Sequence, residues 1–271
     1  GQLITGDGVL YATGGAPNPV GAPDIVGPAT YLSARDGRSW PVPVGADCRL
    51  RGAGGDAGGL YVLDQCVSPG APEPHLRSEQ VVGYDLTGRQ RWSSPLTLQP
   101  GTVAGILGPV FVRGDVVLAE QEQRYVALAT ATGAQLWSTS DPFEPETTVT
   151  DGTRLAWASG IQVTTMDLHS GEQVWQHDWN FPLEADLPAT AGGRLYLIQH
   201  TLGPDVYNCA RDAALLLLDT TTGTYRTPRG SGLPAGVGND CGPDVQDRIY
   251  LRGSFMVLVT ASTVTVLAGH P

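Results

Sequence analysis

Four cysteines have the most definite chemistry in this chain: Cys48, Cys66, Cys209 and Cys241. No two are adjacent and none forms a Cys-x-x-Cys pair, so their spacing disfavours a zinc site. An even number of well-separated cysteines favours disulfides, which persist in oxidising compartments. We therefore expect an extracytoplasmic protein, at the cell surface or secreted. Four reduced, buried thiols are the alternative.

The histidines and carboxylates show no catalytic or metal-binding motif. A His/Asp metal site would need His200 with Asp205 or Asp212, and these spacings match no known ligand pattern. The chain has no Gly-x-Ser-x-Gly turn that could carry a serine nucleophile. We therefore predict no catalytic residue, no metal and no cofactor.

The composition argues against two classes of partner. The formal net charge of the 271 residues is −11, with only 16 lysines and arginines. A nucleic-acid backbone requires clustered positive charge, and an anionic membrane surface requires the same. Hydrophobic residues make up 41% of the chain, which is enough for a substantial core. No apolar run approaches the roughly 20 residues that span a bilayer; an upstream membrane anchor stays open.

A repeated sequence motif predicts the secondary structure that positions these residues. The motif is a hydrophobic run, a polar turn ending in Gly, and a Trp shortly after. Four copies end at Trp40, Trp92, Trp137 and Trp175, and a weaker copy at 218–226 lacks the Trp. The Trp intervals of 52, 45 and 38 residues are typical of propeller blades and solenoid repeats. We expect each turn Gly to adopt a positive φ and each Trp to pack between neighbouring repeats.

Upstream of each turn lies a Gly- or Asp-led apolar segment whose alternation favours a strand over a helix. Each repeat then has four apolar segments, A to D, and the Gly turn joins C to D. Four-stranded antiparallel units around a ring predict an all-β fold, a β-propeller with six blades, or seven as the alternative. We expect a single domain over residues 1–271. Its approximate blades are 1–44, 45–95, 96–140, 141–178, 179–228 and 229–271.

In such a propeller the B–C and D–A connections share one face, and the Gly turns lie on the other. All four cysteines map to the face of the B–C and D–A connections. Pairing Cys48 with Cys66 bridges one blade, and pairing Cys209 with Cys241 bridges adjacent blades. The crossed pairings would span the ring, beyond the ~7 Å Cα limit of a disulfide, unless loops reach across.

The same face carries the long connections, 14–30, 65–80, 199–213 and 229–244. Long loops on a rigid scaffold are where binding residues concentrate. We therefore predict a ligand-binding face made of these loops and an aromatic side chain that follows the fourth Trp strand. Its candidates are His75, Arg77, Trp179, His200, Asp205, Tyr207, Asn208, Arg211, Asp212, Asn239 and Asp240.

The turn-plus-Trp phrase, for example the segment from Leu128 to Trp137, resembles the repeat of the pyrroloquinoline-quinone (PQQ) dehydrogenase family and its cofactor-free relatives. Those relatives include an outer-membrane assembly lipoprotein scaffold and the extracellular sensor domains of some actinobacterial Ser/Thr kinases. The resemblance covers nearly the whole chain and implies a PQQ-like propeller. The dehydrogenases share adjacent cysteines beside the cofactor and are longer, eight-bladed chains. The resemblance therefore favours the cofactor-free branch, and the kinase sensor domains most.

The leading hypothesis is a non-catalytic, extracytoplasmic ligand-binding or sensor domain, the ectodomain of a membrane-anchored bacterial receptor such as a Ser/Thr kinase. Its ligand would be a small molecule, a cell-wall fragment or a protein. Two alternatives are open: a six-bladed Ca²⁺-dependent lactonase-like hydrolase, and a scaffold for protein assembly. The hydrolase would need oxygen ligands converging on the ring axis. The predicted A segments, such as 110–112, are mostly apolar or small.

Overall fold

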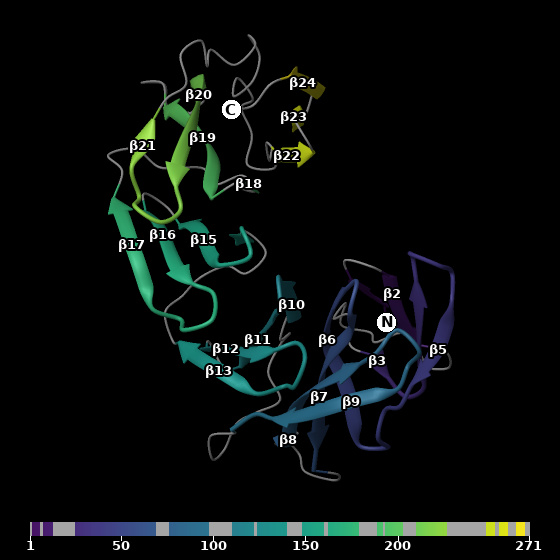
Figure 1. Ribbon diagram of the computed structural model, residues 1–271. Coiled ribbons are helices and arrows are strands. Elements are labelled where there is room, and N and C mark those ends of the chain that lie inside the picture. The colour runs from purple at the N-terminus through teal and green to yellow at the C-terminus, as the bar shows by residue number, and fades with distance from the viewer. Residues whose placement is uncertain are drawn as a thin grey trace. The chain divides into compact units, whose positions relative to one another are not determined.

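The computed structural model describes most of the chain, and every regular element in its described residues is a β-strand (Figure 1). The described residues are 2–5, 8–12, 25–68, 76–97, 110–121, 124–139, 148–159, 162–178, 189–191, 193–202, 210–226, 248–252, 255–259 and 264–268. The chain divides into two compact units, Gly1–Pro142 and Phe143–Pro271.

Three antiparallel sheets make up the first unit. Their strand orders are β1-β2-β4-β5, β3-β6-β7-β8-β9 and β10-β11-β12-β13. The strands are β1 (Gln2–Thr5), β2 (Gly8–Ala12), β3 (Ile25–Val26), β4 (Ala29–Ser33), β5 (Ser39–Val42), β6 (Cys48–Asp56), β7 (Gly59–Val67), β8 (Leu76–Tyr84), β9 (Gln90–Pro95), β10 (Val110–Arg113), β11 (Val116–Gln121), β12 (Arg124–Ala129) and β13 (Gln135–Thr139).

The second unit repeats the pattern. Its sheets have the orders β14-β15-β16-β17, β18-β19-β20-β21 and β22-β23-β24. The strands are β14 (Val149–Thr150), β15 (Arg154–Ser159), β16 (Gln162–Asp167), β17 (Gln173–Asp178), β18 (Ala189–Ala191), β19 (Arg194–Leu202), β20 (Ala210–Asp219), β21 (Tyr225–Arg226), β22 (Arg248–Arg252), β23 (Phe255–Val259) and β24 (Val264–Ala268).

The all-β fold class and its four-stranded antiparallel sheets are confirmed. Apart from β3, which pairs with β6, the strands of each sheet pair in chain order. Contacts between successive sheets join β1 to β6, β6 to β10 and β14 to β18. This is how blades of a propeller stack. The sixth sheet has three strands among the described residues, and the segment predicted to add its A strand, 243–245, lies outside them. The number of blades and the single domain over 1–271 stay predictions.

One strand was not expected. The connection predicted over 14–30 contains β3, in which Ile25 pairs with Leu50 on the free edge of β6. Both side chains are buried in the apolar cluster between the first two sheets. The segment 25–26 thus extends the second sheet to five strands, because burial of Ile25 compensates for a segment too short to show strand periodicity.

Residue alternation along β7 builds the core on both sides of the second sheet. Leu60 and Val62 belong to the apolar cluster shared with the first sheet, and Tyr61 and Leu63 to the cluster shared with the third. Successive side chains of a strand point to opposite faces. Both faces of this sheet are therefore buried against neighbouring sheets, and its strand ends and outer edge are what solvent reaches.

The repeated Trp joins one sheet to the next, as predicted. The indole N–H of Trp92 in β9 donates to the backbone carbonyl of Thr130, 2.8 Å away, in the turn of the third sheet. Trp175 in β17 donates to the carbonyl of Thr220 at 3.0 Å, in the corresponding turn of the fifth sheet. Trp92 and Trp175 thus combine packing area with a satisfied polar group, whereas the buried indole nitrogen of Trp40 has no hydrogen-bond partner.

The turn glycines have a second role that the repeat alone did not reveal. Gly133 has a φ of 70°, as expected for such a turn. A Cβ at Gly133 would also overlap the ring of Trp92 from the preceding sheet, and a Cβ at Gly223 would lie 2.9 Å from the ring of Trp175. The glycine is therefore required both by the turn and by the indole that packs on it.

Candidate functional site

The structure describes four of the predicted ligand-face residues, Arg77, His200, Arg211 and Asp212. All four lie in strands, so the loops are shorter than predicted. Arg77 is near the beginning of β8, and β19 and β20 extend through the other three. Backbone ladders continue past the apolar residues that marked these strands in the sequence. The remaining candidates, His75, Trp179, Asp205, Tyr207, Asn208, Asn239 and Asp240, lie outside the described residues.

Two of these residues occupy equivalent β-bulges. In the β7/β8 pair, Cys66 faces Ser78 and Val67 faces Leu76, which leaves Arg77 as the extra residue. In the β19/β20 pair, the shift between Asp212 and Ala210 leaves Arg211 as the extra residue. Each bulge lies at the end of its sheet opposite the Gly turn. Bulges change the direction of a side chain at a sheet edge, and Arg77 is exposed.

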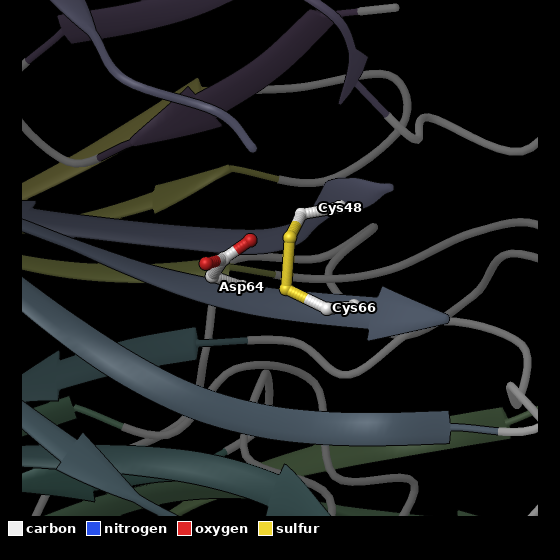
Figure 2. A group of neighbouring side chains, drawn as sticks. All are labelled: Cys48, Asp64 and Cys66. Atoms are coloured by element: carbon white, nitrogen blue, oxygen red, sulfur yellow. A yellow bond between two sulfur atoms is a disulfide. The ribbon is translucent and has the colours of Figure 1, made fainter. Parts of the chain in front are cut away.

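The predicted pairing of Cys48 with Cys66 is present as a disulfide (Figure 2). The two residues face each other directly in the β6/β7 register, with their Cα atoms 3.9 Å apart. Their side chains therefore project from the same face of the second sheet. Cys209 and Cys241 lie outside the described residues, so their pairing stays a prediction.

Asp64 lies beside this disulfide (Figure 2). It precedes Cys66 by two positions along β7, so the strand period places both side chains on one face. One carboxylate oxygen of Asp64 and the sulfur atoms of both cysteines lie within 4.8 Å of one another. No sequence motif marks this grouping, because an isolated Asp near the end of an apolar strand resembles an ordinary solvated residue.

The Asp64 carboxylate is buried and only partly hydrogen-bonded. Asp64 as a whole residue is 8% exposed to solvent. Its Oδ2 accepts a 3.1 Å hydrogen bond from Nε2 of Gln80, whose Oε1 accepts one from the hydroxyl of Ser93 at 2.6 Å. Its Oδ1 is buried with no hydrogen-bond partner. Burial raises the pKa of Asp64 above its ordinary value, and the bond from Gln80 opposes that rise.

The same carboxylate affects a neighbouring tyrosine. Burial, together with the negative charge of Asp64, raises the pKa of Tyr84 to about 12. Tyr84 is therefore neutral at physiological pH, and this face of the sheet carries one buried acid among apolar side chains. Such a group costs free energy unless its polar atoms find partners.

The opposite face of the second sheet is polar at the same end. Gln65 in β7 donates through Nε2 to a carboxylate oxygen of Glu79 in β8, 2.5 Å away. Both residues are buried, and Arg49 faces Gln65 in the β6/β7 register. This end of the sheet thus replaces the apolar packing of its centre with hydrogen bonds on both faces. It is the end that carries the disulfide and the Arg77 bulge.

A separate hollow of about 200 Å³ lies in the fifth sheet. It is lined by Arg194, Leu217, Leu218, Asp219, Thr224 and Tyr225. These residues surround the Gly turn, at the end of the sheet opposite Arg211. The hollow therefore lies on the Gly-turn side of this sheet, opposite the end with the predicted ligand-binding loops. Among the described residues, no helix is long and apolar enough to cross a membrane.

Comparison with known proteins places the repeat in a family. Residues 77–236 match the family model described as outer membrane protein assembly factor BamB. The crystal structure of BamB from Moraxella catarrhalis is similar over 100% of this chain and 85% of its own, with 16% identity and a TM-score of 0.47. Apo AztD from Citrobacter koseri is similar over 83% of this chain and 58% of its own, with 13% identity and a TM-score of 0.47. No curated protein matches the sequence.

Proposed function

This chain belongs to the family of outer membrane protein assembly factor BamB, and from that membership we propose that it is a non-catalytic, extracytoplasmic protein-binding domain. The family match over residues 77–236 carries the proposal, because it includes the repeats that contain Trp92, Trp137 and Trp175. The family description concerns the assembly of membrane proteins, and assembly requires contact with another protein. PQQ and its redox chemistry have no part in the proposal.

The disulfide supports the extracytoplasmic part of the proposal. Disulfides such as Cys48–Cys66 persist outside the cytoplasm and are rare where thiols are kept reduced. The net charge of −11 supports a protein partner over nucleic acid or an anionic membrane surface.

The packing of the sheets limits where a partner could bind. Both faces of the second sheet are buried against neighbouring sheets, so the strand ends are the accessible part of such a blade. At the end opposite its Gly turn, the second sheet has a bulge at which Arg77 is exposed, and the fifth sheet has an equivalent bulge at Arg211. Arginine is enriched in protein interfaces, where its planar group binds carboxylates and carbonyls. In each unit, we assign partner contacts to this end of its sheets, where the predicted loops of that unit also lie.

A more specific version of the proposal is that the domain belongs to a receptor. If the domain is the ectodomain of a membrane-anchored receptor such as a Ser/Thr kinase, the same surface would bind a cell-wall fragment or a small molecule. The resemblance of the repeat to such sensor domains supports this form. The two forms differ in the ligand and share the binding face.

Position-specific cross-linking in the native envelope tests the proposal. A photo-reactive amino acid is placed in the full-length protein at Arg77 or Arg211, and at Thr132 or Thr222 as matched controls in exposed Gly turns. We expect the two bulge positions to give adducts with the same protein, and the turn positions to give none. Equal cross-linking from both ends would refute the assigned face. A Ca²⁺-dependent rise in melting temperature would favour the hydrolase instead.

A further inference from the structure

The two sulfur atoms of Cys48 and Cys66 and a carboxylate oxygen of Asp64 form a set of potential metal ligands in the second sheet (Figure 2). While the disulfide is intact, neither sulfur is a thiolate, and thiolates are the form of cysteine that binds metals. Reduction would convert the same three side chains into a thiolate–thiolate–carboxylate set. Zinc and similar thiophilic divalent cations are bound by such sets.

We propose that reduction of the Cys48–Cys66 disulfide opens a binding site for one thiophilic divalent cation of the zinc class, ligated by the two thiolates and Asp64. A dithiol reductant supplies two electrons and two protons, so the S–S bond breaks, two thiols form, and the reductant becomes a disulfide. The cation then displaces both thiol protons to solvent and forms two metal–sulfur bonds and one metal–oxygen bond.

The strand register brings the three side chains together at one end of the second sheet. Tetrahedral zinc with sulfur and oxygen ligands places them about 3.5–4 Å from one another. The three ligand atoms lie within 4.8 Å of one another before any metal is present. The β6/β7 backbone pairing, which extends from Cys48 to Asp56, holds the two strands together without the disulfide. The sulfur atoms therefore need to separate only by rotation about side-chain bonds.

Asp64 is prepared for this role by its partners. Its Oδ2 is held by Gln80, and Gln80 is held in turn by Ser93. A metal-binding carboxylate typically has such an outer hydrogen bond, which fixes its orientation. Its Oδ1 is buried without a hydrogen-bond partner. One carboxylate oxygen of Asp64 lies near both sulfur atoms, and a metal bound there would offset the cost of burying this charge.

Cys48 is the most exposed of the three proposed ligands. It is partly buried and follows the exposed residues Gly45 to Asp47, whereas Asp64 and Cys66 are buried. A cation would reach the site from the end of the sheet at Cys48. Three protein ligands leave a fourth position of the tetrahedron for water or another donor.

Cobalt binding to the reduced protein tests the site, because thiolate ligation of Co²⁺ gives a charge-transfer band and tetrahedral geometry gives visible bands. The full-length protein is reduced with a water-soluble phosphine, which becomes the phosphine oxide, and the reagent is removed under argon. We expect one equivalent of Co²⁺ to bind the reduced protein, Zn²⁺ to displace it, and the oxidised protein to bind none.

Variants distinguish Co²⁺ binding at this site from adventitious Co²⁺ binding elsewhere on the protein. Gln80→Met removes the hydrogen bond that orients Asp64 and should weaken Co²⁺ binding by about 10–100-fold. Asp64→Asn changes a proposed ligand itself and should weaken binding by more. Asp85→Asn, at an exposed turn away from the cluster, should bind as the wild type does. Cys48→Ser/Cys66→Ser should show no charge-transfer band.

Four results would overturn the proposal. They are no cobalt spectrum for the reduced protein, unchanged affinity in Asp64→Asn, equal binding by the double-serine variant, and loss of the β-sheet circular dichroism spectrum on reduction. The last result is decisive even if the double-serine variant fails to fold, because it is measured on the wild-type chain.

Discussion

Substitution of Gly133 by Ala tests how the Trp joins neighbouring sheets. Gly133 has a φ of 70°, and a Cβ at this position would overlap the ring of Trp92. Two costs are therefore expected. A left-handed backbone conformation costs an L-residue about 1–2 kcal/mol, and forcing extra volume into a packed contact costs about 1–3 kcal/mol.

Gly37 provides a matched control in the same unit. It occupies the equivalent turn of the first sheet with a φ of 67°, and a Cβ there would meet nothing within 4 Å. Gly37→Ala should therefore incur only the backbone cost. The difference between the two variants isolates the contact with Trp92, and we expect it to be about 1–3 kcal/mol.

Urea denaturation followed by Trp fluorescence and circular dichroism measures both free energies of unfolding. Combining Gly133→Ala with Trp92→Ala gives the coupling between the two residues, which should be about 0.5–3 kcal/mol for a direct contact. Equal destabilisation by Gly37→Ala and Gly133→Ala, or the absence of coupling, would refute the view that the turn glycine is required by the neighbouring indole.

Three further predictions concern hydrogen bonds, the disulfide and pH. Trp92→Phe removes the bond to the Thr130 carbonyl and should cost about 1 kcal/mol in urea denaturation; an unchanged midpoint would contradict this. Replacement of Cys48 and Cys66 by serine, which removes a disulfide between residues separated by 18 positions and leaves the predicted Cys209–Cys241 pairing in place, should lower the free energy of unfolding by about 3 kcal/mol through loss of loop closure; an unchanged free energy of unfolding would contradict this. Hydrogen bonds from the backbone N–H groups of Thr222 and Thr221 hold the pKa of Asp219 below its ordinary 3.8. The folded state therefore binds the proton less readily than the unfolded state, and the stability from this charge is present at neutral pH and lost as the pH falls through the folded pKa. Asp219→Asn, which keeps the acceptor oxygen, should be less stable than the wild type at pH 7 and approach it as the pH falls towards 3; a constant difference would contradict the assignment.

Much of the fold could be predicted because the information is local. Each Gly turn and the Trp that follows lie within ten residues, and an apolar run after a Gly, such as 60–63, marks a buried strand directly. The cysteine pair could be placed because the order of strands brings Cys48 and Cys66 to the same end of one sheet. These inferences need only the repeat and the period of a strand.

The other features depend on contacts between distant residues. Ile25 and Val26 form a strand only because the edge of β6 is free to pair with them. The bulges at Arg77 and Arg211 depend on the register of two strands. Asp64 looks solvated in the sequence, and its burial follows from the sheet that packs over it. No local sequence pattern shows which distant residues will pair with or pack against these segments.

Hydrogen exchange of the full-length protein, alone and with the partner identified by cross-linking, tests the central claim most directly. The claim is that the partner binds the strand ends opposite the Gly turns. We predict new protection in peptides that contain Arg77 and Arg211, and none in peptides that contain the turns at Gly88 and Gly133. Protection confined to the Gly turns would contradict the account.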